Sequence, residues 1–396
     1  MSDETKASAT VSDYLRWRGD LTFAQDGFNE VDNLLLCIIS YIKLENIPRL
    51  RSFDPKDAMP MGDVCRLLTE EDEQLGLSTL DYIPLMRQAA ETPRFREVSL
   101  FAFESLHDED RQMQFAAVSF LLPDGSVYAA YRGTDMTIVG WQEDFNMSFL
   151  SAVPAQVKAA EYAGAVARAC PRRALRIGGH SKGGNLAAWA AVHLDEKLQR
   201  QRLIAAYNND GPGFSRDLVD TPSYQAVADR LFTYIPASSI VGVLLEHAED
   251  YEVVDSTARS IMQHEPLSWC VEGPRFVHLG QRSQLGQLSD GVLREWIGSM
   301  SSREREQFSR AFFDILSRGG RTKTLEDLRS GGLAAGAALI REYAGADEEK
   351  KKIISEIFRR LAVDVKDELM KAARAGVRRA GESILATGQA IADLRK

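Results

Sequence analysis

Cysteine is scarce in this chain of 396 residues, and proline is absent beyond Pro274. The four cysteines stand singly, without the C-x-x-C pairs of a zinc site or the density of a disulfide framework, so we expect buried, reduced thiols. No apolar run reaches the ~18 residues that cross a bilayer, and the polar N-terminus lacks the features of a secretory signal. These absences predict a cytoplasmic protein without a transmembrane segment. The cysteines are Cys37, Cys65, Cys170 and Cys270.

Positive charge is also in deficit, because 48 basic residues are outnumbered by 57 acidic ones and the net charge is −9. This balance does not suit a nucleic-acid-binding surface. Residues 319–396 differ, with 16 basic and 12 acidic residues, Gly-Gly breaks at 319 and 331, and a composition rich in helix formers. We therefore divide the chain into a polar leader at 1–10, a main domain at 11–318 and a C-terminal helical extension at 319–396.

An apolar stripe runs through this extension from Ile353 to Leu369, at spacings of three and four residues. Such spacing predicts one apolar face along a helix. Three partners for that face are open: the main domain, a second copy of the chain, or a membrane surface, for which the basic residues offer weak support.

The main domain alternates between strand and helix patterns. A helix is expected over 28–47 after an N-terminal turn, although the run LLLCII also fits a buried strand. Two strands should flank the Pro-Asp-Gly turn within 112–131. The alternation that follows predicts an α/β fold, with a mostly parallel central sheet and helices on both faces. It comprises helices at 155–169 and 185–199 and strands at 174–178, 202–210, 231–235 and 251–256.

A G-x-S-x-G sequence centred on Ser181 lies between the strand at 174–178 and the next helix. A turn this tight leaves no space for side chains at Gly179 and Gly183, and it presents the serine hydroxyl at the edge of the sheet. Five residues alone are a weak signal, but the flanking strand and helix strengthen it. We predict Ser181 as a nucleophile and the N–H of Lys182, at a helix N-terminus, as an oxyanion donor. A phosphate loop needs the order Gly-Lys-Ser/Thr, which is not present here.

A nucleophilic serine needs a histidine base, which follows the serine and the acid along the chain in this kind of site. His247, His264 and His278 come after Ser181 and after its helix. We predict His264 as the base because it lies in a loop beyond the strand at 251–256. A structural histidine that bonds only to the backbone is the alternative.

The acid that orients the histidine is less well defined by the sequence. Asp210 ends the strand at 202–210 and precedes Gly-Pro, where its carboxylate could hold the imidazole. Capping of that turn explains Asp210 equally well, and Glu246 is a second candidate. YRGTD at 131–135 completes the predicted site, because its glycine permits close approach and Thr134 could supply the other half of an oxyanion hole.

YRGTD, the W-x-x-D-F that follows it and GGHSKGGNLA resemble the motif series of class 3 (fungal-type) lipases, which have the α/β-hydrolase fold. The resemblance implies Thr134 in the oxyanion hole and Ser181 as the nucleophile. The chain is more similar to a bacterial lipase-like family, domain of unknown function 2974. That similarity covers most of residues 11–315 and includes DYLRWRGDLTF, FNEVDNLLL, NNDGPGF and QHEPLSW.

One position departs from the lipases. Their acid lies in a strand-end N-D-x-V-P segment, whereas IPASSIVG places Ser239 at the aspartate position. The acid is therefore Asp210 or Glu246, or it is absent and a Ser-His dyad acts alone. The apolar SIVGVLLE run that overlaps this segment either lines an acyl pocket or belongs to the core.

The motifs and the resemblance together predict a serine ester hydrolase that acts on an acyl ester or lipid through an acyl-enzyme on Ser181. They imply no metal, no cofactor and no nucleic-acid partner. The alternative is a non-catalytic regulatory protein that keeps the turn around Ser181 and binds a partner with its C-terminal helices.

Overall fold

The computed structural model describes most of the chain and has a nine-stranded sheet at its centre. The sheet order is β1-β2-β3-β4-β5-β6-β7-β8-β11. Neighbours from β4 to β8 pair in parallel, whereas the strands at both edges pair antiparallel. The described residues are 8–69, 82–134, 138–245, 247, 249–283, 286–287, 292, 295–317, 341–357 and 359–360.

The parallel strands are the short, buried central ones, and all of them end at the same edge of the sheet. A separate ribbon pairs β9 (Val271–Glu272) with β10 (Arg275–Phe276). The strands of the main sheet are β1 (Met59–Pro60), β2 (Ser99–Asp108), β3 (Met113–Leu121), β4 (Val127–Tyr131), β5 (Leu175–His180), β6 (Leu203–Asn209), β7 (Leu231–Pro236), β8 (Tyr251–Val254) and β11 (His278–Leu279).

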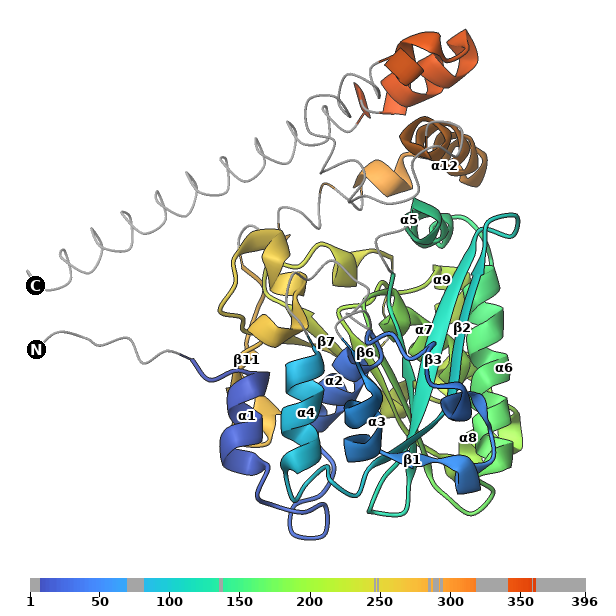
Figure 1. Ribbon diagram of the computed structural model, residues 1–396. Coiled ribbons are helices and arrows are strands. Elements are labelled where there is room, and N and C mark those ends of the chain that lie inside the picture. Colours follow the sequence, from blue (N-terminus) through green and yellow to red (C-terminus); the bar gives the residue numbers. More distant parts are fainter. Residues whose placement is uncertain are drawn as a thin grey trace, which may run out of the picture.

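Helices cover both faces of the sheet and enclose two apolar cores (Figure 1). Successive strand residues point to opposite faces, which places Val118 in the core under α1 to α4 and Ala117 in the core under α6 and α7. This architecture is an α/β-hydrolase fold, as the sequence predicts. The helices are α1 (Val11–Arg18), α2 (Glu30–Ile39), α3 (Met61–Leu67), α4 (Ile83–Glu91), α5 (Ile138–Asn146), α6 (Pro154–Ala169), α7 (Lys182–His193), α8 (Glu196–Arg202), α9 (Arg216–Val219), α10 (Pro222–Gln225) and α12 (Ser302–Ser317).

Two predicted elements differ from the structure. The segment expected as an N-terminal turn is the helix α1, whose first turn is held by Asp13 accepting the N–H of Thr10 at 2.9 Å. The single helix expected over 185–199 is divided into α7 and α8, because Leu194 is extended and Asp195 caps the start of α8. Asp195 is a favourable N-cap residue, so the break has a signal in the sequence that our prediction overlooked.

The sequence prediction also missed β2, the long strand next to β3. Its pairing with β3 shifts register between Phe101 and Glu104, and Ala102 has a φ of 55°. The irregularity interrupts the alternation of apolar and polar residues on which strand prediction depends. The helix around LLLCII, the hairpin of β3 and β4, and the strands β5 to β8 are confirmed.

The described C-terminal helices pack on each other and on α5 (Figure 1). Phe308 of α12 and Phe145 of α5 have ring centroids 5.4 Å apart. Ile354 and Ile357 are buried in the same small core. The first part of the predicted apolar stripe therefore packs within the chain. Residues 1–7 of the predicted leader at 1–10, residues 318–340 and residues 361–396 lie outside the described residues.

All four cysteines are buried and carry free thiols, as predicted. Burial in apolar surroundings raises the pKa of the Cys37 thiol to about 12 and that of Cys65 to about 11. In the part of the chain that the structure describes, no helix is long and apolar enough to cross a membrane.

A buried ion pair joins the N-terminal helices to the segment after α4. Arg94 and Asp32 are both fully buried, and Nε of Arg94 donates to Oδ1 of Asp32 at 2.7 Å. The guanidinium also donates to the carbonyl oxygens of Leu21, Asp26 and Gly27 at 2.8–3.1 Å. The Arg94 side chain therefore neutralises the buried Asp32 carboxylate. It also supplies hydrogen-bond donors to the carbonyl oxygens of a loop without regular secondary structure.

We expect Arg94→Leu to lower the free energy of unfolding by about 3–5 kcal/mol, because it leaves the Asp32 carboxylate buried without a counter-charge. Urea denaturation followed by circular dichroism measures the loss. The double variant Arg94→Leu/Asp32→Asn should recover part of it, since the charge is then gone. A loss below about 1 kcal/mol in the single variant would contradict this role for the pair.

Candidate active site

The turn between β5 and α7 places Ser181 at the end of a central strand. Ser181 has φ 59° and ψ −135°, a region that side-chain-bearing residues rarely adopt, and α7 begins at the next residue. Its N–H donates to the carbonyl oxygen of Asn209 at 2.9 Å. A β-carbon on Gly179 would overlap the backbone of Gly183, and one on Gly183 would overlap the carbonyl of Tyr131. The close approach of strand, turn and helix therefore requires both glycines.

Asp210 lies just beyond the end of the neighbouring strand β6, also at a positive φ of 53°. Its side chain is fully buried, and its carboxylate accepts three hydrogen bonds. Nδ1 of His264 donates to Oδ2 at 2.6 Å, the hydroxyl of Ser239 donates to the same oxygen at 2.6 Å, and the N–H of Gly242 donates to Oδ1 at 3.1 Å. The structure thus brings together two of the predicted site residues, His264 and Asp210.

Two contacts fix the loop that carries His264. Nε2 of His180 lies 2.8 Å from the carbonyl oxygen of His264. The side chain of the preceding residue, Gln263, accepts the N–H of Ser238 at 2.7 Å. With Asp210 bound at Nδ1 and only 13% of the side chain exposed, the imidazole of His264 has little freedom to rotate.

Ser181 and His264 are linked through His180 and share no direct hydrogen bond among the described residues. The ring of His180, the residue before Ser181, lies against that of His264 with centroids 4.6 Å apart. Since Nδ1 of His264 faces Asp210, Nε2 is the ring nitrogen available to a hydroxyl group. Across the described residues, no hydrogen bond joins that Nε2 to Ser181.

The loop after β4 passes beside Ser181. A β-carbon on Gly133 would lie 3.0 Å from Cβ of Ser181 and would overlap the carbonyl oxygen of His180. The hydroxyl of the next residue, Thr134, donates to the carboxylate of Asp144 on α5. The hydroxyl is therefore already engaged, and the N–H is the group of Thr134 that can reach a ligand next to Ser181.

The side chain of Lys182 makes contacts that the sequence prediction did not include. The side chain is 1% exposed, and Nζ donates to the backbone and side-chain oxygens of Gln114 at 2.9 and 2.8 Å. It also lies 3.1 Å from Oε2 of Glu143 on α5. Glu143 accepts the N–H groups of Gln114 and Ala155 as well, each at 3.0 Å. This fully hydrogen-bonded ion pair fixes the start of α7 to β3 and α5.

The other histidine candidates bind elsewhere. His247 lies 3.2 Å from Oε1 of Glu249 and 2.8 Å from the carbonyl oxygen of Gly242. Burial raises the pKa of Glu249, but the hydrogen bond and charge of His247 outweigh it and lower that pKa to about 2. His278 binds a carboxylate of α2 at 2.8 Å. Glu246, the second candidate for the acid, lies outside the described residues.

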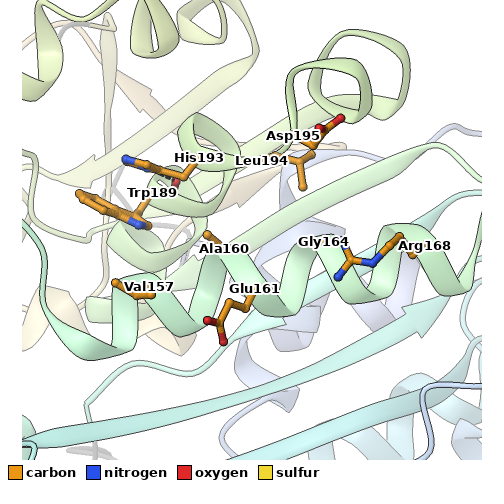
Figure 2. A pocket seen from close by; sticks show the side chains of 9 residues that line it. All are labelled: Val157, Ala160, Glu161, Gly164, Arg168, Trp189, His193, Leu194 and Asp195. Atoms are coloured by element: carbon orange, nitrogen blue, oxygen red, sulfur yellow. Dashed lines mark hydrogen bonds between the residues drawn. The ribbon is translucent and has the colours of Figure 1, made fainter.

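A surface pocket of about 460 Å³ lies away from this cluster, between α6 and the last turns of α7 (Figure 2). Trp189 and His193 stack at one end of it, and Arg168 lies at the other. Trp189 is two helical turns beyond Ser181, or ~11 Å along the axis. The pocket is therefore not part of the candidate site. Within the described ranges, no group of three or more His, Cys, Asp or Glu residues could hold a metal ion.

Sequence reasoning missed three contributors: the side chain of Lys182, its partner Glu143, and His180. A lysine within GHSKGGNLAAWAA is surrounded by small and apolar residues, which signals a buried charge but does not name its partner. His180 occupies the variable position of G-x-S-x-G, so the motif gives it no role. In the sequence, Ser239 is only a departure from the aspartate position of the lipase motif. Its contact with Asp210 depends on the packing of β6 beside β7.

Comparison with known proteins identifies the family of the chain. A family model described as Mbeg1-like matches residues 89–314, more than half of the sequence. No curated protein sequence matches significantly. The solved structures that match include the Rhizomucor miehei lipase in its propeptide complex, at 16% identity over 44% of this chain and 72% of the other, with a TM-score of 0.33.

Two further lipase structures match at a similar level. The Lip2 lipase from Yarrowia lipolytica is 14% identical over 63% of this chain and 91% of its own, and the M37 lipase is 15% identical over 55% and 70%; both have a TM-score of 0.34. At such values the fold assignment rests on the strand order and helix placement described above. The extent of the family match leads to one conclusion: the chain belongs to the Mbeg1-like family.

Proposed function

We propose that the protein is a serine hydrolase that cleaves a carboxylic ester through an acyl-enzyme on Ser181. The observation that carries the proposal is the hydrogen-bonded pair of His264 and Asp210 beside a serine at positive φ, at the ends of adjacent parallel strands. A nucleophile, a base and an orienting carboxylate in this arrangement are the parts that acyl transfer needs.

In the first half of the reaction, Nε2 of His264 takes the proton of the Ser181 hydroxyl as Oγ bonds to the ester carbonyl carbon. Asp210 accepts from Nδ1 and stabilises the imidazolium that forms. The tetrahedral intermediate then expels the alcohol, which takes its proton from Nε2, and the acyl group stays on Oγ. The hydrogen bond of 2.6 Å from Nδ1 to the Asp210 carboxylate keeps the proton of the neutral ring on Nδ1, so that Nε2 is free to act as the base.

Two backbone N–H groups are available for the oxyanion. They belong to Thr134, directly after Gly133 in the loop that passes beside Ser181, and to Lys182, the first residue of α7. Neither N–H donates a hydrogen bond within the part of the chain that the structure describes. Unpaired donors at a helix N-terminus, beside a nucleophile, stabilise the charge that develops on the carbonyl oxygen.

The second half of the reaction repeats these steps with water. His264 takes a proton from a water molecule, whose oxygen attacks the acyl carbon, and the carboxylic acid leaves as Ser181 regains its proton.

Asp210 is the acid that we assign, in preference to Glu246 or a Ser-His dyad. Its carboxylate is bonded to His264, and Ser239, at the position where the lipases carry their aspartate, donates to it instead of replacing it. Asp210 follows β6, whereas Ser239 follows β7. Because β6 and β7 are neighbours in the sheet, a carboxylate at the end of either strand lies within reach of the His264 imidazole.

A fluorophosphonate probe tests the nucleophile. We expect the wild-type protein to be labelled, and Ser181→Ala and His264→Ala to lose labelling, since one removes the attacking oxygen and the other removes its base. Gel fluorescence and intact mass measure the label. Ser223→Ala, which changes an exposed serine of α10, is the matched control and should label normally. Failure of the wild-type protein to label would refute the proposal.

Replacing the acid should slow the reaction without abolishing it. Asp210→Asn should lower kcat/KM for a short-chain p-nitrophenyl ester by about 10³–10⁴-fold, because an amide can hold the wrong tautomer of His264. Ser239→Ala, which removes one hydrogen bond to the carboxylate, should cost about tenfold. Asp217→Asn, an exposed residue of α9, serves as control. Unchanged rates in Asp210→Asn, with the fold verified by its melting curve, would exclude Asp210 as the acid.

His180 is a positioning residue in this proposal. Its Nε2 faces a carbonyl oxygen, which can only accept, so Nε2 carries the proton and Nδ1 accepts from the hydroxyl of Tyr41 at 3.1 Å. Burial, and then the neighbouring His264, hold the pKa of His180 well below its usual range. The folded protein therefore keeps His180 neutral at a pH where the unfolded chain protonates it.

Stability should consequently fall as the pH drops below ~6.5, the pKa of histidine in an unfolded chain. The unfolded state then binds a proton that the folded state does not. Between pH 7 and pH 5.5, the free energy of unfolding should fall by about 1 kcal/mol more in the wild-type protein than in His180→Gln, because glutamine does not titrate. Urea denaturation at both pH values gives the difference, and an equal loss in both proteins would contradict the assignment.

A further inference from the structure

A second pocket, of about 280 Å³, lies between the loop after β7, the segment after β6 and the residues that lead into α12. Its wall is mostly apolar and is formed by Phe214, Ile297 and the run from Val243 to Leu245. This run is the SIVGVLLE segment, so its side chains line a cavity instead of being entirely core. A volume near the lower end of the ~300–1,000 Å³ typical of ligand pockets suits a short chain.

The polar groups of this pocket are positive or lack partners. Nε of Arg305 donates to the carbonyl oxygen of Ile297 at 3.1 Å, and its Nη1 donates to the carbonyl oxygen of Ser148. Among the described residues no carboxylate neutralises Arg305, and burial lowers its pKa. Arg216 is exposed, and its guanidinium makes no hydrogen bond or ion pair with any described residue. Two cations that no carboxylate of the described residues neutralises favour an anionic ligand.

One further group points to a ligand. Ser148 is one of the residues that line the pocket, and its hydroxyl is buried without a hydrogen-bond partner. Buried polar atoms are almost always paired, and the carbonyl oxygen of this residue already accepts from Arg305. The unpaired hydroxyl therefore indicates a position that an oxygen atom of a bound molecule would fill.

We propose that this pocket binds a short-chain amphiphilic anion, an alkyl carboxylate or alkyl phosphate. Its chain packs on Phe214 and Val243 to Leu245, and its anionic group binds Arg216, Arg305 and the hydroxyl of Ser148. An alkyl carboxylate is also the class of product that the proposed ester hydrolysis releases. The binding itself, however, does not depend on catalysis at Ser181.

The pocket is joined to the candidate active site through its walls. Asn185 on α7 donates to the carbonyl oxygens of Pro212 and Gly213, directly before Phe214. Gly242, directly before Val243, donates its N–H to Asp210. A ligand in the pocket therefore contacts the two segments that border the nucleophile helix and the acid.

Calorimetric titration of the full chain tests the proposal with octanoate, octyl phosphate, the uncharged octyl glucoside and inorganic phosphate. We expect either or both octyl anions to bind at one site, with octyl glucoside and inorganic phosphate at least about tenfold weaker, because both chain and charge are needed. Tighter binding of octanoate or of octyl phosphate identifies the head group.

Three variants locate the site. Arg216→Gln should weaken binding of the octyl anion by about five- to tenfold and Ser148→Ala by about threefold, from the loss of one charge-assisted and one neutral hydrogen bond. Arg168→Gln is the matched control, since it removes an exposed arginine from the other pocket (Figure 2). Equal binding of octyl glucoside, or equal affinity in wild type and Arg216→Gln, would overturn the proposal. This experiment measures binding and not catalysis. Its outcome therefore does not depend on whether the fluorophosphonate probe labels Ser181.

Discussion

The abrupt turn from β5 into α7 determines where every other group of the candidate site must lie. Ser181 has a positive φ because α7 starts directly after the strand, and this is possible only where Gly179 and Gly183 let the backbones touch. The hydrogen bond from Ser181 to Asn209 then ties the turn to β6. Since parallel strands end at one edge of the sheet, the residue after Asn209 is brought beside the serine.

That neighbour is Asp210, whose side chain is surrounded by hydrogen-bond donors. The carboxylate is buried, and it accepts from His264, Ser239 and the N–H of Gly242. Ser239, which follows the neighbouring strand β7, thus donates to a carboxylate one strand away. A buried anion needs such donors, because an unpaired one would be driven to bind a proton.

Helix α5 connects this site to the C-terminal part of the chain. On one side Glu143 binds the buried ammonium group of Lys182, and Asp144 accepts from Thr134. On the other side Phe145 packs on α12, and Asn146 accepts from Ser309 at 2.7 Å. Consecutive residues of one helix therefore support the turn around Ser181 and receive the C-terminal helices, which gives those helices a packing role within the chain.

The sequence by itself determined the alternation of strands and helices, the parallel centre of the sheet, the tight turn at Ser181 and the eligible histidine and carboxylate residues, because these depend on local spacing and on glycine. The division at residue 319 and the resemblance to family 2974 stay predictions. Only the tertiary structure decided that His264 meets Asp210, that Ser239 supports it, and that Lys182 is buried against Glu143. Each of these contacts joins residues 29 to 54 positions apart. No local pattern encodes which buried polar group will pair with which.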